Sequence, residues 1–164
     1  MKGEIRKYPV DSPKNWEGDD KDEKDASLNY GIFERELRKY GVDLAKSKVL
    51  EVGTGNNTFL NYVRKQGVDI IGVDARPRGE KSKALIASRV EQLPFRNETF
   101  DVVLSAGVFD GSTYHQDQRA MLDEIRRVLK ENGLFLGMIN KIDIPVEKFT
   151  LVSDREALEM YKKI

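Results

Sequence analysis

Hydrophobic and polar positions along the chain follow two alternating periods. Short apolar runs, typical of strands that are buried on both faces, occur at 49–52, 68–73, 84–87, 100–105, 134–139 and 148–152. Segments with helical spacing of apolar residues lie at 28–40, 58–66 and 116–130. Gly41, Gly67 and Asn132-Gly133 are the expected helix stops. The run Ser153-Asp-Arg-Glu156 has the form of a capping box and predicts a last helix towards Lys162.

This alternation of strands and helices predicts an α/β fold. Short connections and right-handed crossovers give a doubly wound, mostly parallel, Rossmann-like sheet of about six strands with helices on both faces. A ligand crevice is expected at the carboxyl ends of the strands. The fold is expected to form a single compact domain over residues 28–164, preceded by a partly disordered tail at 1–27, whose acidic run at 17–25 should be solvated. Tyr8 and Trp16 could fold back as a lid, or anchor on the nearest apolar surface.

The stretch 48–58 predicts a strand, a glycine turn and a helix in succession. Gly53 and Gly55 allow backbone angles that a Cβ would forbid, and the N–H groups at the helix start can hold polar parts of a nucleotide-like ligand. Asp74 ends the second apolar run, close to the roughly 20-residue separation of a ribose-binding carboxylate. The alternatives are an ordinary turn at the glycines and a simple capping residue at Asp74.

Composition narrows the chemistry. The 164 residues suit one domain, and the 28 basic and 28 acidic side chains leave no global basic charge to attract nucleic acid or an anionic membrane. The absence of cysteine and the single histidine, His115, predict no metal site of the thiolate or multi-histidine kind. Without a long apolar run or an apolar leader, the protein is expected to be cytoplasmic and not associated with membranes.

Four motifs, in order, resemble those of the class I S-adenosylmethionine-dependent methyltransferases, of the kind called type 11. They are Val49-Leu-Glu-Val-Gly-Thr-Gly55, Gly72-Val-Asp74, Glu91-Gln-Leu-Pro-Phe95 with Phe100-Asp101, and Glu124-Ile-Arg-Arg-Val-Leu-Lys-Glu-Asn-Gly133. The resemblance covers about residues 28–140. It implies that S-adenosyl-L-methionine is the cofactor and that the activity is transfer of its methyl group.

The resemblance also implies which residues bind the cofactor. Glu51, Gly53 and Gly55 would border its methionine part. Asp74 would bind its ribose hydroxyls, and Arg76 would flank its adenine. The full implied set is Glu51, Gly53, Thr54, Gly55, Asn57, Asp74, Ala75, Arg76, Ser88, Arg89, Val90 and Ser105.

The chain departs from the family pattern at Asn57, where a third glycine is usual, and at Arg89, where an aspartate often reads the adenine edge. Asn tolerates left-handed backbone angles. Arginine only donates hydrogen bonds. Ser88, a backbone carbonyl or Glu91 would therefore have to accept the hydrogen bond from the adenine amino group.

Candidate catalytic residues lie on the segment after the fourth strand. Asp110 or His115 could accept a proton from an attacking hydroxyl or amine, and Tyr114 could shape the pocket. The alternatives are a turn at Asp110, packing for Tyr114 and a place near the next helix start for His115. The methyl acceptor stays open between a small molecule and a macromolecule. A partner macromolecule or the second subunit of a homodimer could complete the site.

Two other functions compete with methyl transfer. The fingerprint of a nicotinamide oxidoreductase has glycine at the position of Thr58. Such an enzyme would also need a catalytic Tyr and Lys or a substrate domain, and the sequence shows neither clearly. A binding protein that kept the fold and lost the chemistry is the other reading, since a fold does not fix a function.

Overall fold

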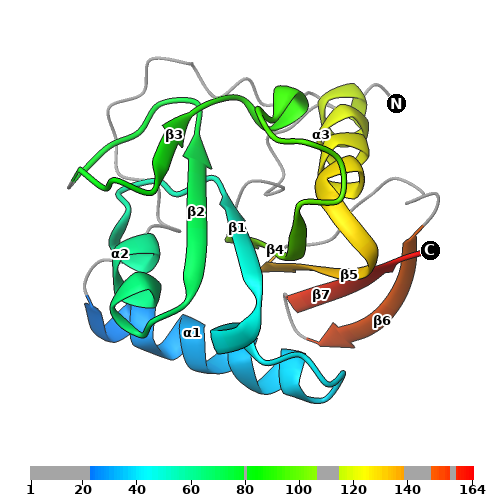
Figure 1. The fold of residues 1–164 in the computed structure, drawn as a ribbon, viewed down its shortest axis with the longest axis horizontal. Helices are drawn as coiled ribbons and strands as arrows, with labels where there is room; N and C mark the ends of the chain where they lie inside the picture. The colour runs from blue at the N-terminus through cyan, green and yellow to red at the C-terminus, as the bar shows by residue number, and fades with distance from the viewer. Residues whose placement is uncertain (1–22, 80, 107–114, 139–148, 156–157) are drawn as a thin grey trace, which may run out of the picture.

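The computed structural model describes residues 23–79, 81–106, 115–138, 149–155 and 158–164 (Figure 1). Within these ranges a seven-stranded sheet has the order β3-β2-β1-β4-β5-β7-β6. The strands are β1 Lys48–Val52, β2 Asp69–Asp74, β3 Leu85–Ala87, β4 Phe100–Ala106, β5 Leu129–Met138, β6 Phe149–Arg155 and β7 Leu158–Lys163. The predicted doubly wound α/β fold is confirmed, with one strand more than expected.

The first five strands are parallel, and they bring the ends of β1, β2, β3 and β4 to one edge. Val52 pairs with Val73 of β2 and with Ser105 of β4. On the other side of β2, Asp74 pairs with Ala87. The ends of β1, β2, β3 and β4 therefore lie side by side, at the edge towards which β2 points in Figure 1.

Helices cover the sheet on both faces. The helices α1 Glu23–Arg38 and α2 Thr58–Lys65 bury Phe33, Leu37, Phe59 and Leu60 against one face. On the other face α3 His115–Val128 buries an apolar stripe at helical spacing, which consists of Met121, Leu122, Ile125 and Val128. Two short 3₁₀ turns, η1 Leu44–Lys46 and η2 Val90–Gln92, complete the described elements.

Helix α1 begins at Glu23, five residues earlier than the helix expected from position 28, and includes residues assigned to the tail. Glu23 and Asp25 lie in its first turn, where negative charge is stabilised by the helix dipole. The Glu23 carboxylate also pairs with Lys65 at the end of α2. The last residues of the acidic run therefore belong to a helix, in which Glu23 and Lys24 stay exposed to solvent.

The predicted last helix is wrong, because residues 158–163 form strand β7. Met160 and Tyr161 are consecutive and both buried, and they contribute to the two opposite core clusters. Such alternation fits a strand that is covered on both faces. The strand pairs antiparallel with β5 and with β6, so it covers the edge of β5 that would otherwise be unpaired. This tertiary pairing outweighs the local capping signal.

The amino ends of the strands are joined by hydrogen bonds to the Asp101 carboxylate. Asp101 accepts hydrogen bonds from the Lys48 backbone N–H and from the Lys130 Nζ, both at 2.8 Å. Partial burial opposes the charged form, but these hydrogen bonds prevail and hold the pKa of Asp101 below its ordinary value. These two hydrogen bonds stabilise the amino-terminal end of the sheet, opposite to the edge where β1, β2, β3 and β4 end.

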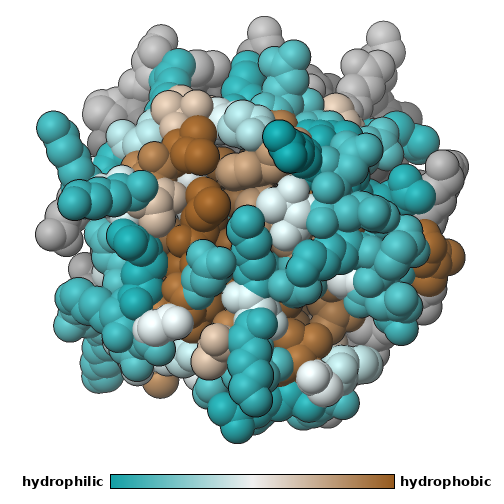
Figure 2. Space-filling model, in the orientation of Figure 1, coloured by the Kyte–Doolittle hydropathy of each residue, from teal (hydrophilic) through white to brown (hydrophobic). Residues whose placement is uncertain are grey.

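The visible surface is mainly hydrophilic. Figure 2 shows an apolar strip over β2 with hydrophilic side chains on either side. The hydrophobic residues that are only partly covered on β2 and β3 include Ile71 and Ile86, and Ile86 is 37% exposed. Among the described residues, no helix combines the length and hydrophobicity needed to cross a bilayer.

Met160→Ala tests the burial of β7. Met160 is fully buried, so the truncation should lower the free energy of unfolding by about 2–5 kcal/mol, measured by urea denaturation. Ile164→Ala is the matched control, because Ile164 is 65% exposed and its truncation should change stability by less than about 0.5 kcal/mol. Equal, small losses for both variants would contradict this placement of β7.

Candidate functional site

The turn after β1 uses left-handed backbone angles at alternate residues. The φ angles of Gly53, Gly55 and Asn57 are 78°, 55° and 67°. The Gly53 N–H donates to the Val73 carbonyl at 2.8 Å, which joins the start of the turn to the end of β2. Asn57 then serves as the N-terminal cap residue of α2. The left-handed conformation that was predicted for Asn57 is confirmed.

Asp74, at the end of β2, holds two backbone segments with one carboxylate. Its Oδ2 accepts from the Gly55 N–H at 2.9 Å, and its Oδ1 accepts from the Arg76 N–H at 2.7 Å. Each carboxylate oxygen has a second lone-pair direction, so the group can still accept hydrogen bonds from a ligand. Asp74 is therefore a structural part of the turn as well as a candidate ligand residue.

The loop after β2 is fastened onto the same turn. The Asn57 side-chain amide donates to the Arg78 carbonyl at 2.6 Å, and the Arg78 N–H donates to the Gly55 carbonyl at 3.1 Å. Gly79 has a φ of +74°, and a Cβ there would lie 2.2 Å from the Asn56 carbonyl oxygen. The Asn57 side chain is thus bonded to the neighbouring loop, and it is only 1% exposed.

Buried polar side chains gather where β1 and β4 end. Glu51, Thr54 and Ser105 are 3%, 5% and 0% exposed. Within the described part of the chain, the Thr54 Oγ1 and the Ser105 Oγ have no hydrogen-bond partner. A buried hydroxyl without a partner costs about 1–3 kcal/mol, so such groups are typical of positions that bind a ligand.

The segment that follows β3 completes this edge of the sheet. The Ser88 N–H donates to the Asp74 carbonyl at 3.0 Å, and the Ser88 Oγ donates to the Gln92 carbonyl at 2.9 Å. The exposed Arg89 side chain pairs with Glu91 at 3.0 Å. Burial opposes the charged form of Glu91, but the Arg89 hydrogen bond prevails and lowers the pKa of that carboxyl. Val90 is a core residue, 7% exposed.

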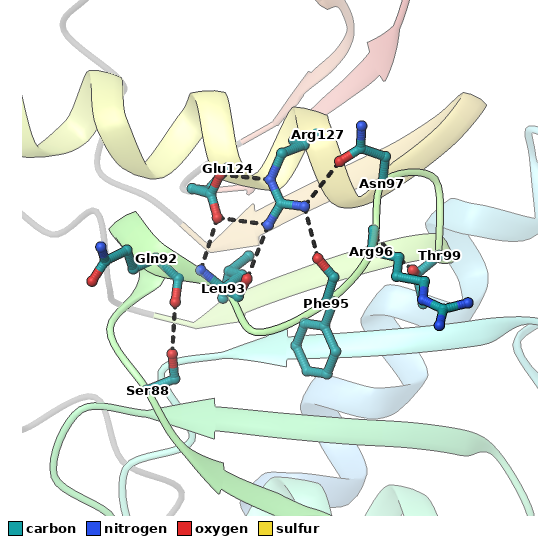
Figure 3. Close-up of polar contacts among 9 residues, drawn as sticks. All are labelled: Ser88, Gln92, Leu93, Phe95, Arg96, Asn97, Thr99, Glu124 and Arg127. Atoms are coloured by element: carbon teal, nitrogen blue, oxygen red, sulfur yellow. Dashed lines mark hydrogen bonds and ion pairs between the residues drawn. The ribbon is translucent and has the colours of Figure 1, made fainter.

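Glu124 and Arg127 of α3 form a polar network with the segment 93–97 (Figure 3). The Arg127 guanidinium binds Glu124 Oε1 and Oε2 at 2.7 and 2.8 Å. It also donates to the carbonyl oxygens of Leu93 and Phe95, at 2.9 and 2.7 Å, and to Asn97 Oδ1 at 3.0 Å. Glu124 Oε2 in turn accepts from the Leu93 N–H at 2.8 Å.

The two charges of this network stabilise each other. The hydrogen bonds from Arg127 lower the pKa of Glu124 despite partial burial, and the bonds to Glu124 raise the pKa of Arg127. The sequence motif around Glu124 and Arg127 resembles that of the family, but the resemblance implies no role for either side chain. Their spacing of three residues on a helix was the available signal for an ion pair.

The predicted site residues divide into three groups. The structure brings Glu51, Gly53, Thr54, Gly55, Asn57, Asp74 and Ser105 together around the ends of β1, β2 and β4. Ala75, Arg76 and Arg89 are exposed at the edge of this region, beside Ser88 and the buried Val90.

The predicted catalytic residues Asp110 and Tyr114 lie outside the described residues. The third, His115, is the first residue of α3, and the structure describes its backbone only. The described residues contain no cluster of three or more His, Asp or Glu side chains that could hold a metal ion.

Comparison with known proteins gives one consistent family. Residues 50–137 match the Methyltransferase domain family. An uncharacterized protein of Methanocaldococcus jannaschii is 28% identical over 148 residues, which is 81% of this chain. An uncharacterized methyltransferase of Synechocystis is 29% identical over 120 residues, which is 67% of this chain.

The chain spans 71% of the length of that Methanocaldococcus protein and 56% of the Synechocystis protein. It spans 37% and 41% of two further Methanocaldococcus relatives.

Solved structures share the fold. The 1,6-didemethyltoxoflavin-N1-methyltransferase of Burkholderia thailandensis, solved with 1,6-didemethyltoxoflavin and S-adenosylhomocysteine, superposes with a TM-score of 0.60 at 18% identity. The match covers 94% of this chain and 93% of that one. The PH0226 protein of Pyrococcus horikoshii has a TM-score of 0.59 at 17% identity, covering 84% and 91% of the two chains.

Gly79→Ala tests the contact between the loop and the glycine turn. The new Cβ would clash with the Asn56 backbone at a positive φ, so the free energy of unfolding should fall by more than about 1 kcal/mol in urea denaturation. Gly31→Ala is the control, since Gly31 lies inside α1 with open space around it and alanine should stabilise the helix by about 0.5–1 kcal/mol. Wild-type stability in Gly79→Ala would mean that the loop does not lie against the turn.

Proposed function

The chain belongs to the family of S-adenosylmethionine-dependent methyltransferases, and we propose that the ends of β1, β2 and β4 hold this cofactor. When bound, S-adenosylmethionine supplies an activated methyl group on a sulfonium. One observation carries the assignment to this site. Buried hydroxyls that have no partner among the described residues, on Thr54 and Ser105, lie at the same strand ends as the Asp74 carboxylate and the turn at Gly53 and Gly55.

These residues fit the parts of the cofactor. The Asp74 carboxylate, already oriented by the Gly55 and Arg76 N–H groups, accepts hydrogen bonds from the ribose diol. The glycine turn has no side chain at Gly53 or Gly55, so a ligand can approach its backbone. Ser105 and Thr54 offer hydroxyl groups, and Glu51 a carboxylate, to the polar methionine end.

Asn57 is compatible with an active site. Its amide is bonded to the Arg78 carbonyl of the loop after β2, so the side chain has a defined place outside the glycine backbone. We infer that Asn57 takes over the role of the usual third glycine by adopting the same left-handed angles. The extra side chain serves to fasten the loop.

Arg89 departs from the family in function as well as in identity. Its guanidinium is paired with Glu91 and cannot accept a hydrogen bond from the adenine amino group. The acceptor for that group therefore comes from the Ser88 hydroxyl, from the backbone of the segment 88–92 or from the Glu91 carboxylate.

The methyl acceptor must place a nucleophile in line with the S–CH₃ bond of the cofactor. Transfer from a sulfonium to a nucleophile depends mainly on in-line positioning. Asp110, His115 and Tyr114 follow β4 in the sequence and stay the candidates for proton removal and pocket shape. The acceptor is a small molecule or a macromolecule, and a second subunit of a homodimer could complete the site around it.

Binding of S-adenosylhomocysteine is the direct test of the cofactor. A ligand at 100 times its Kd should add about 2.7 kcal/mol to the free energy of unfolding, seen as a rise in Tm by calorimetry. NAD at the same concentration should leave the Tm unchanged, which excludes the oxidoreductase alternative. No shift with millimolar S-adenosylhomocysteine would overturn the proposal. Binding without transfer to any offered acceptor would favour the binding-protein alternative.

Ser105→Ala should separate ligand binding from folding. The variant removes a buried hydroxyl that has no partner in the part of the chain that the structure describes, so the stability of the ligand-free protein should stay equal or rise. The affinity for S-adenosylhomocysteine should fall about three- to tenfold, as expected for one lost hydrogen bond. Thr54→Val should behave in the same way at β1. Unchanged affinity in both variants, measured by isothermal titration, would place the ligand elsewhere.

A further inference from the structure

The segment from Ser88 to Asn97 links the candidate site to helix α3. Its first residue is bound to the end of β2 through the Ser88 N–H and the Asp74 carbonyl. The Ser88 hydroxyl then bonds the Gln92 carbonyl, which closes η2 into a compact turn. If the cofactor lies on Asp74, this turn is the wall next to its adenosine end.

The other end of the segment has no regular secondary structure between η2 and β4, and α3 supplies its hydrogen bonds. Arg127 donates to the Leu93 and Phe95 carbonyls, and Glu124 accepts from the Leu93 N–H. The backbone adds the Glu98 N–H to the Arg127 carbonyl at 3.0 Å, and the Thr99 N–H to the Val128 carbonyl at 2.8 Å. All these partners lie in the last turns of α3.

Side-chain packing supports the same attachment. Leu93 is 5% exposed and Phe95 packs edge-on against Phe100, with ring centroids 4.9 Å apart. Burial fixes these side chains against the core, but it leaves the backbone polar groups of residues 93–95 in need of partners. The planar guanidinium of Arg127 can donate hydrogen bonds to both carbonyls and to the Glu124 carboxylate at the same time.

We propose that Glu124 and Arg127 are positioning residues for the adenosine end of the cofactor, which they control through the backbone of residues 88–95. This inference rests on the proposed function and adds a determinant of cofactor recognition. Within the described part of the chain, the side-chain hydrogen bonds of Glu124 and Arg127 are to each other and to residues 93–97, so both act through the segment. Their effect matters more here because Arg89 replaces the usual acceptor and recognition of adenine falls to the other groups of the segment 88–92, its backbone among them.

The position of a backbone acceptor decides how well it distinguishes adenine from a base without the 6-amino group. A carbonyl in the right place accepts from the amino group, whereas a 6-oxo group in its place presents a second acceptor and is rejected. If Arg127 and Glu124 hold that backbone in place, loosening their network reduces this discrimination as well as the affinity.

The test compares two ligands, S-adenosylhomocysteine and its analogue with a 6-oxo group in place of the 6-amino group, by isothermal titration. Arg127→Lys keeps the charge but loses the fork that binds both carbonyls, and Glu124→Gln keeps the shape but loses the charge. Each variant should bind S-adenosylhomocysteine about tenfold more weakly than the wild type, while the analogue changes less, so that the ratio of the two Kd values approaches one.

Lys130→Ala is the matched control, because it removes the partner of Asp101 at the other end of the sheet. It should leave the ratio of Kd values unchanged even if it lowers the Tm as much as the test variants do. Equal weakening of both ligands in Arg127→Lys and Glu124→Gln, or wild-type binding in both variants, would overturn the positioning role. Absence of binding by the wild-type protein would instead overturn the proposed cofactor.

Discussion

The hydrogen bonds of the Asp74 carboxylate are the interaction on which the rest of the site depends. By accepting from Gly55 and from Arg76, this one side chain fixes the glycine turn of β1 and the loop of β2 relative to each other. Gly53, Gly55 and Asn57 take left-handed angles that are costly for most residues, and such angles persist only where surrounding contacts determine them. The bonds from Asn57 and Arg78 strengthen the same junction.

The two ends of the sheet are stabilised in different ways, and this difference has a functional meaning. At the amino ends of the strands, Asp101 has its partners within the protein, in Lys48 and Lys130. At the carboxyl ends, the hydroxyls of Thr54 and Ser105 are buried without partners among the described residues. The protein thus gives up some stability at one edge, as is common where a ligand provides the missing hydrogen bonds.

Much of the fold could be predicted from the sequence, because buried parallel strands are marked by apolar runs and helices by their spacing. The glycine turn, Asp74 and the left-handed Asn57 were predictable for the same reason, since each depends on local backbone chemistry. Strand β7 was not, because Ser153 and Glu156 resemble a helix start locally, whereas the pairing of Met160 with Leu136 depends on the whole sheet. The hydrogen bond from the Gly55 N–H to Asp74 and the bonds of Arg127 to residues 93–97 were not predicted, since both join segments far apart in the sequence. The roles of Asp110, Tyr114 and His115 stay predictions.

Amide hydrogen exchange with and without S-adenosylhomocysteine tests the central claim most directly, because it reports on each strand end separately. The claim is that one ligand binds to the turn of β1, the end of β2 and the segment after β3 together. It predicts that the ligand slows exchange at residues 53–57, 74–79 and 88–93, while residues 48 and 129–133 at the opposite end of the sheet exchange as before. Protection confined to other regions, or a uniform change over the whole sheet, would contradict this site.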